Sequence, residues 1–345
     1  MSTKERTRQE IIVPNTPPIP GLTFRHYRGS EDLPDMLTLN NMVKEVDQTG
    51  EVETLEQLAH HYNHLKNCDP YRDVILSELD GKLIAYCRVS WVKEEDGPYL
   101  YRSFGNIHPD FRREGLGKAL LAYNQNRLRE IAEENDHPSH APRFFERWSG
   151  NTMPGTTALL EKEGYQAERY FFEMVRPIEK SIPEAPMPEG LEVRPVKKEN
   201  FRAIWEASDE AFRDHWGHVA GTEEDYQRFL NDPDNEPELW KVAWDGDQVA
   251  GMVLNCFFEE EDKKFNRKRG WTDPICVRRP WRRRGLASSL IAQSIHMFRE
   301  MGFTDTALGV DTDNPSGALN LYKRMGYENT KTWISYRKKM EKTDE

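Results

Sequence analysis

The feature that most constrains how this chain folds is an apolar segment that runs into a basic turn and then into a helix, and it occurs twice. In the second half, residues 275–277 are apolar, residues 278–284 are mostly arginine, and a helical apolar pattern begins at Leu286. In the first half, residues 104–107 lead in the same way into the basic turn 112–117. The pattern predicts a duplicated strand–turn–helix unit.

Other landmarks repeat at a nearly constant distance. The start of a strand at Gly21 recurs at Gly190, and the Asp-Gly hairpin signal that ends at Gly81 recurs at Gly246. These pairs stand 169 and 165 residues apart, and the two basic turns stand 170 residues apart. A chain of 345 residues suits two domains of ordinary size. We therefore predict an α/β fold with two tandem domains, each a mixed, mostly antiparallel twisted sheet flanked by helices.

Proline content marks the expected boundaries. Residues 1–20 are polar and then proline-rich, which is typical of a flexible, extended N-terminal arm. The first domain is expected over 21–176 and the second over 190–340. Between them, 177–189 combines prolines with charges, as a linker does.

Composition excludes several classes of protein. No apolar run is long enough to cross a membrane and the polar start lacks a signal-peptide core, so we expect a cytoplasmic protein. The net charge of −11 argues against binding to nucleic acid or anionic membranes and suits a cationic acceptor. Four scattered cysteines predict no disulfide framework. His60 and His64 have a spacing that suits metal ligands, but no third ligand is evident, so we expect no metal.

Each basic turn stands where a helix begins. Unpaired N–H groups and the helix dipole make that position an anion site, and arginines suit a diphosphate. The residues are Arg282-x-x-Gly285-x-Ala287 in the second copy and Arg112-x-x-Gly115-x-Gly117 in the first. Both resemble the Arg/Gln-x-x-Gly-x-Gly/Ala signature of the GNAT superfamily of N-acetyltransferases, which holds the diphosphate of acetyl-CoA.

The resemblance implies acetyl-CoA as the cofactor and assigns residues to it. In the second domain these are Val277, Arg282, Arg283, Arg284, Gly285, Leu286, Ala287, Ser288 and Asn314. In the first domain they are Ile107, Arg112, Arg113, Gly115, Gly117 and Lys118. In the family the strand before the turn splays from its neighbour, which would place the backbone N–H of Val277 beside the thioester carbonyl.

A second stretch, residues 314–327, resembles the family's Asn followed by Leu-Tyr-x-x-x-Gly-Phe/Tyr. There the tyrosine is the general acid that protonates the departing thiolate, and the matching residue is Tyr322. Asn314 also suits a helix N-cap, with Pro315 as the first helical residue. In the first copy the equivalent position is Leu160, which cannot donate a proton. We therefore expect the first domain to bind acetyl-CoA weakly or structurally, and the second to be the catalyst.

The sequence does not single out one residue as the general base. Asp273 is the first candidate, because strand alternation places it on the same face as Val277, although an exposed carboxylate or a bulge beside Pro274 explains it equally well. Glu192 is another, and a water chain needs no side chain at all. The acceptor pocket is expected to include Asp214, His215, Trp216 and Trp271, although 212–217 also fits a loop held by aromatic packing.

The sequence thus predicts an acetyl-CoA-dependent N-acetyltransferase that acts on the primary amine of a small molecule by direct attack in a ternary complex. Acetylation of a protein or peptide N-terminus, and a non-catalytic acetyl-CoA-binding regulatory module, stay open as alternatives. The duplicated layout, with the intact second signature only in the C-terminal half, resembles the mycothiol synthase group. The acceptor there is a cysteinyl-glucosaminyl-inositol, and we take from this group the architecture but not the substrate. Two domains can stand in for a homodimer, which favours a monomer.

Overall fold

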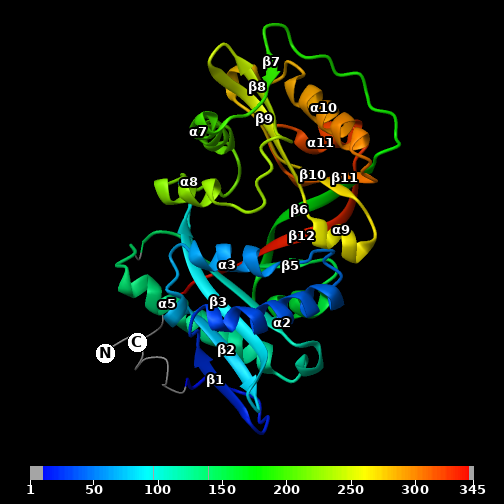
Figure 1. Cartoon of the computed structure of the whole chain (residues 1–345). Coiled ribbons are helices and arrows are strands. Elements are labelled where there is room, and N and C mark those ends of the chain that lie inside the picture. The colour runs from blue at the N-terminus through cyan, green and yellow to red at the C-terminus, as the bar shows by residue number, and fades with distance from the viewer. Residues whose placement is uncertain (1–10, 96, 139, 342–345) are drawn as a thin grey trace. The chain divides into compact units, whose positions relative to one another are not determined.

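The computed structural model describes residues 11–95, 97–138 and 140–341 (Figure 1). It forms two compact α/β units, one made of the described residues of Met1–Glu168 and Ile334–Glu345, the other of Arg169–Trp333. The units do not coincide with the sequence ranges expected for the domains. Most of β6 (Gln166–Pro177) belongs to the second unit, and the end of β12 (Glu328–Lys339) belongs to the first. Each half of the chain thus gives a strand segment to the other unit.

The first unit is built on a mixed sheet in the order β1-β2-β3-β4-β5-β12. All pairs from β1 to β4 are antiparallel, whereas β4 and β5 are parallel. Its strands are β1 (Leu22–His26), β2 (Val74–Leu79), β3 (Lys82–Lys93), β4 (Tyr99–Ile107) and β5 (Arg143–Gly150). Its helices are α2 (Leu33–Val46), α3 (Leu55–Asn63), α4 (Pro70–Asp73), α5 (Leu116–Glu134) and α6 (Pro154–Lys162), with short 3₁₀ turns at Ser30–Asp32 and Pro109–Phe111.

The second unit repeats this plan in the order β7-β8-β9-β10-β11-β6-β12. Along this order from β7 to β6, the neighbouring strands β10 and β11 are parallel, and the other neighbouring pairs are antiparallel. Its further strands are β7 (Glu192–Arg194), β8 (Lys241–Asp245), β9 (Gln248–Phe257), β10 (Arg269–Val277) and β11 (Asp305–Asp311). Its helices are α7 (Phe201–Phe212), α8 (Glu223–Leu230), α9 (Glu259–Phe265), α10 (Leu286–Glu300) and α11 (Ala318–Arg324), with 3₁₀ turns at Lys198–Asn200 and Arg279–Trp281. The predicted mixed sheet with flanking helices is confirmed.

Local sequence signals explain most element boundaries. Asp80 and Gly81 both have positive φ, the conformation that a two-residue hairpin needs, and they join β2 to β3 as predicted. Gly246 likewise has positive φ between β8 and β9. The expected start of α11 is wrong. Gly317 precedes its first residue, Ala318, in the left-handed conformation, and Pro315 lies in the preceding turn.

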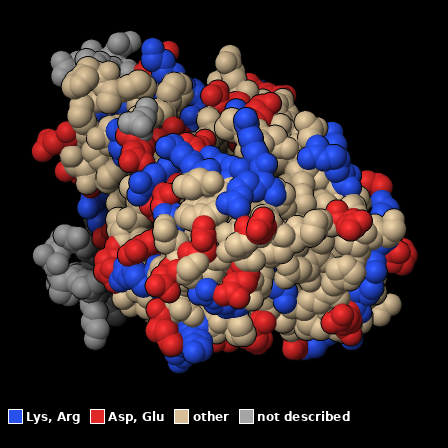
Figure 2. All heavy atoms as spheres, turned by 90° about the horizontal axis from the view of Figure 1, so that it is seen from above, with Lys and Arg blue, Asp and Glu red and all other residues tan. Residues whose placement is uncertain are grey.

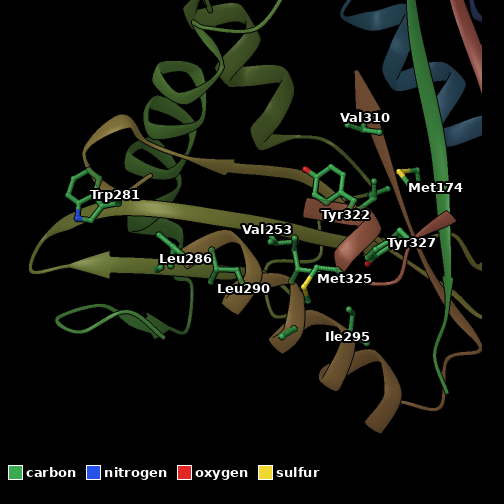
Figure 3. Packing of buried hydrophobic residues seen from close by; sticks show 14 of the residues in the cluster. Met174, Val253, Trp281, Leu286, Leu290, Ile295, Val310, Tyr322, Met325 and Tyr327 are labelled. Carbon is green, nitrogen blue, oxygen red and sulfur yellow. The ribbon is translucent and has the colours of Figure 1, made fainter. Parts of the chain in front are cut away.

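The largest core cluster of the second unit lies between the sheet and α10. Leu290, Ile291 and Ile295 are fully buried on the inner face of this helix, and they pack in one cluster with Val253 of β9 and Met325 (Figure 3). Burying such side chains stabilises the fold by about 1.5–3 kcal/mol each. None of the helices in the described ranges is long and apolar enough to span a bilayer.

Part of the expected N-terminal arm packs on the first unit. Val13 is buried in a cluster with Phe24, Leu116 and Leu120, and the backbone N–H of Ile11 donates to the carbonyl of Phe24. Ile11 and Val13 therefore lie against the unit, whereas the first ten residues of the expected arm fall outside the described residues.

Gly251 on β9 is predicted to be required for packing. A Cβ at this position would lie 2.8 Å from the Cys276 carbonyl oxygen and 3.0 Å from Val277 Cγ2. We expect Gly251→Ala to destabilise the second unit by about 1–3 kcal/mol, because backbone must shift. Gly155→Ala, in a helix with no atom within 4 Å of the new Cβ, is the control and should not destabilise. Calorimetric unfolding measures both, and equal melting temperatures for wild type and Gly251→Ala would contradict the prediction.

Candidate active site

The candidate site forms where two parallel strands of the second unit separate. Residues Arg269–Trp271 of β10 pair with Asp305–Ala307 of β11, and the pairing ends there, although β10 continues to Val277 and β11 to Asp311. On its other edge β10 stays paired with β9 up to Val277. The sheet is therefore open along one edge of β10, directly before the basic turn.

A β-bulge marks the separation. Thr272 pairs with Asn255 and Ile275 pairs with Val253, so β10 has one extra residue at Asp273 and Pro274. The extra residue interrupts the alternation of side chains. The expectation that Asp273 shares a face with Val277 by alternation is therefore wrong, whereas the open alternative of a bulge at this position is confirmed.

The carboxylate of Asp273 lies against β11. It accepts a hydrogen bond from the backbone N–H of Gly309, and a Cβ on that glycine would lie 3.2 Å from its Oδ2. Although the residue is partly open to solvent, neighbouring protein desolvates its carboxyl, and this raises the pKa of Asp273 to about 6. Such a carboxyl exchanges a proton readily near neutral pH.

The backbone N–H of Val277 faces the opening. The next N–H, that of Arg278, donates to the Ala250 carbonyl of the β9 segment at 3.0 Å. Because successive residues of a strand direct their N–H groups to opposite edges, the N–H of Val277 is directed away from β9 and toward the gap. The carbonyl oxygen of Val277, on the same edge of β10, already accepts a hydrogen bond from Nε of Arg282 at 2.9 Å.

The turn has the backbone of an anion site. Arg283 and Gly285 have φ of 59° and 90°, and α10 begins at the next residue, Leu286. Left-handed residues in such a turn direct neighbouring N–H groups toward a common side. A Cβ on Gly285 would meet no atom within 4 Å, so the approach is open. In the first unit Arg113 and Gly115 have the same conformation, with φ of 70° and 94°.

The signature arginines hold the turn in place rather than facing an anion. Arg282 donates to the carbonyls of Val277 and Ala211 at 2.9 and 3.0 Å and to Asp214 at 2.6 Å. In the first unit Arg112 donates to the Ile107 carbonyl at 3.1 Å and to Asp47 at 2.6 and 3.1 Å. The interpretation of these two guanidinium groups as phosphate ligands is therefore not supported by their geometry.

The other arginines of the turn reach solvent. Arg283 and Arg284 are exposed, and Arg284 donates to the Glu189 carbonyl at 3.1 Å. The face that includes β8 and the start of α10 shows a patch of Lys and Arg side chains bordered by acidic ones (Figure 2). Ala287 and Ser288 are half-buried in the first turn of α10, and Leu286 is in the core.

Asp214 differs from its expected place in an acceptor pocket. Arg279 and Arg282 both donate to it, and these bonds hold the pKa of its carboxyl well below the ordinary range. It ties the loop after α7 to the basic turn. Asp47, which follows α2, does the same for Arg112.

The remaining expected acceptor residues lie in two places. Trp271 stands on β10 two residues before Asp273, and its indole N–H is buried with no partner among the described residues. Trp216 packs against Phe171 of β6, with the guanidinium of Arg169 over its ring at 5.5 Å. Burial lowers the pKa of His215, which keeps its imidazole neutral near pH 7. The open alternative of a loop held by aromatic packing thus describes Trp216 well.

Glu192 is excluded as a base by its position. It is on β7, which is separated from β10 by β8 and β9, and at about 4.8 Å per strand it is about 14 Å away. Its carboxylate pairs with Arg194.

Tyr322 lies on α11 with its ring in the core cluster, beside Val310 of β11 (Figure 3). Desolvation raises the pKa of its phenol far above the usual range, and the negative charge of Asp273 adds to the shift. The phenol therefore stays protonated at neutral pH, as a general acid must. Its counterpart Leu160 is fully buried in the first unit. Asn314 caps no helix but accepts hydrogen bonds from the N–H groups of Ser316 and Gly317.

In the first unit the remaining assigned residues have structural contacts. A Cβ on Gly117 would lie 3.2 Å from Ile107 Cδ1, so this glycine permits close packing of helix on strand. Lys118 forms an ion pair with Glu163 at 3.1 Å.

One feature near the site was missed from the sequence. Gly309 inside β11 is a signal for the close approach of another group. The pairing of Asp214 with the basic turn has no sequence signal, since 65 or more residues separate the partners.

Comparison with known proteins assigns the family. The profile described as "Acetyltransferase (GNAT) family" matches residues 39–147 and 201–327. This chain belongs to the GNAT acetyltransferase family. Each matched range contains one basic turn of the GNAT fold, which agrees with the duplication.

Curated relatives of this GNAT chain are similar over most of its length. A mycothiol acetyltransferase of Geodermatophilus obscurus is 27% identical over 270 residues, which cover 77% of this chain and 82% of the relative. A mycothiol acetyltransferase of Catenulispora acidiphila is 23% identical over 313 residues, which cover 88% and 95%. The chain is therefore an acyltransferase with mycothiol acetyltransferase relatives.

Solved structures show the same tandem fold. A GCN5-related N-acetyltransferase from Sphaerobacter thermophilus has a TM-score of 0.68 at 24% identity, covering 93% of this chain and 96% of that one. A tandem GNAT protein from the clavulanic acid biosynthesis pathway has a TM-score of 0.63 at 16% identity, covering 94% and 100%.

We predict that Asp214 stabilises the second unit in a pH-dependent way. Its folded pKa is depressed, so its contribution is present above about pH 4, the ordinary pKa of an aspartate, and is lost as the pH falls through the lower folded value. Wild type should therefore unfold at higher urea concentration than Asp214→Asn at pH 7, with the difference shrinking toward pH 3. A difference that stays constant over this range would contradict the assignment.

Proposed function

We propose that the second unit transfers the acetyl group of acetyl-CoA to the primary amine of a small molecule, by direct attack in a ternary complex. One observation carries the proposal: the gap between β10 and β11 leads straight into a turn whose N–H groups are open to an anion. GNAT acetyltransferases as a family use acetyl-CoA, and the features of this gap fit such a molecule.

The residues present suit each part of acetyl-CoA. The N–H groups at the start of α10, with Arg283 and Arg284 exposed nearby, suit the diphosphate. The open edge of β10 can pair with the amide-containing arm as a neighbouring strand would. The N–H of Val277 can polarise the thioester carbonyl. Bound there, acetyl-CoA supplies an activated acyl group, and the chain supplies position and charge.

Two side chains suit the proton transfers. Asp273, with its raised pKa, can accept a proton from the ammonium group of the acceptor, which frees the nitrogen lone pair for attack on the thioester. Tyr322, which stays protonated, can donate to the departing thiolate. Asp273 is close enough for its charge to contribute to the raised pKa of Tyr322, which supports assigning both groups to one site. In this scheme the amine nitrogen bonds to the acyl carbon, the carbon–sulfur bond breaks, and the products are an amide and CoA.

The acceptor proposed here is small. The relatives that cover most of this chain carry the name mycothiol acetyltransferase, which is a small-molecule acetylation. No observation favours a polypeptide N-terminus or a purely regulatory role. Asp273 and the buried indole N–H of Trp271 are the polar groups that the acceptor would meet on β10.

Tyr322→Phe is expected to lower kcat about 10²-fold, because it removes a proton donor and leaves the ring's packing intact. The measurement is CoA thiol release with a panel of amines. Tyr226→Phe on α8, another buried tyrosine of the same unit, is the control and should retain wild-type turnover. Wild-type kcat in Tyr322→Phe would remove the tyrosine from the mechanism.

The pH profile tests Asp273. As a base it must be ionised, so kcat/KM should rise with pH through about 6, the pKa of its carboxyl, and fall below it. Asp273→Asn keeps an oxygen for the Gly309 N–H but cannot take up the proton. We expect this variant to have a kcat/KM about 10²-fold below that of wild type. Its kcat/KM should also no longer rise with pH near pH 6. If that rise persists in Asp273→Asn, another group or the amine itself titrates there.

A further inference from the structure

The strand pairing gives an exact equivalence between the two units, and it places an arginine where the candidate site has a glycine. The first parallel pair is Tyr99 with Arg143 in the first unit, and Arg269 with Asp305 in the second. Counting four residues along β5 and β11 from these pairs leads to Arg147 and to Gly309.

Arg147 bridges the gap of the first unit. The pairing of β4 with β5 ends at Arg102 and Glu146, so the strands separate one residue before Arg147. Its guanidinium nitrogen donates to the Gly105 carbonyl of β4 at 3.1 Å. Arg147 is half-buried, and desolvation by the surrounding protein lowers the pKa of its guanidinium. At the matching position in the second unit, a Cβ on Gly309 would meet one atom of the described residues within 4 Å, Oδ2 of Asp273 at 3.2 Å.

The β4 strand also lacks the bulge. Its register with β3 runs without a shift from Ala85–Ile107 to Lys93–Tyr99, whereas β10 shifts after Thr272. The Gly105 carbonyl faces the gap. Because it already accepts a hydrogen bond from Arg147, it is not free to pair with a ligand.

The turn of the first unit is partly covered as well. A Cβ on Gly115 would meet Pro17 Cβ at 3.7 Å, and Val13 of the same segment packs with Leu116. The equivalent position in the second unit, Gly285, meets no atom within 4 Å.

We infer that Arg147 occupies the place of the acyl-CoA arm in the first unit, so that the chain binds one acetyl-CoA, in the second unit only. This inference rests on the proposed use of acetyl-CoA by the second unit. It replaces the expectation from the sequence that the first domain binds acetyl-CoA weakly or structurally. The first unit then has a structural role, because its own Arg147 fills the gap between β4 and β5.

The experiment is calorimetric titration of the full chain with CoA, together with a reciprocal exchange of the two residues. Wild type should bind one CoA per chain. Arg147→Gly should raise the stoichiometry above one by opening the gap of the first unit. Gly309→Arg should lose the wild-type site, because the arginine fills the gap of the second unit as Arg147 fills that of the first. Circular dichroism and the melting temperature show whether each variant is folded.

Each result decides the matter. Two equivalents in wild type, a single equivalent in folded Arg147→Gly, or unchanged affinity in folded Gly309→Arg would overturn the inference. If Gly309→Arg fails to fold, the wild-type and Arg147→Gly titrations still decide. Failure of the proposed function looks different: wild type would bind no CoA, or would bind it and acetylate no amine in the panel.

Discussion

The structure depends on the point at which two parallel strands stop pairing. A sheet normally satisfies every backbone group of an interior strand, and leaving such groups unpaired is costly unless something else pairs with them. Here β10 is interior, yet its edge toward β11 opens after three pairs, and a bulge with Asp273 and Pro274 bends it there. An opening of this kind is a site for an extended ligand with amide groups.

The basic turn extends this opening into an anion site, and its shape is fixed by contacts on its far side. Arg282 fastens the end of β10 to the loop after α7 through two carbonyls and Asp214. The same fastening recurs with Arg112 and Asp47 in the first unit. An arginine suits this task because its rigid fork donates to several acceptors at once. The signature arginine thus holds the turn in place, and in the proposed function it is the backbone N–H groups that bind the diphosphate.

The sequence predicted what local patterns determine. The duplication, the basic turns, the hairpins at Gly81 and Gly246 and the strand-to-helix connection at Gly285 all follow from neighbouring residues. The fold family followed from the same turns. The partners of Arg282, the exchange of strand segments between the units and the contact of Arg147 with Gly105 could not be predicted, because they depend on contacts between distant residues. The start of α11 was missed because Gly317, not Asn314, precedes the helix.

The central claim is that the opening beside β10 holds acetyl-CoA with its sulfur next to Tyr322. A crystal structure with a non-hydrolysable acetyl-CoA analogue tests it most directly. The account predicts the diphosphate on the N–H groups of residues 283–288, the acyl carbonyl within hydrogen-bond distance of the Val277 N–H, and the sulfur within reach of the Tyr322 hydroxyl. An analogue bound elsewhere, or a sulfur far from that hydroxyl, would contradict it.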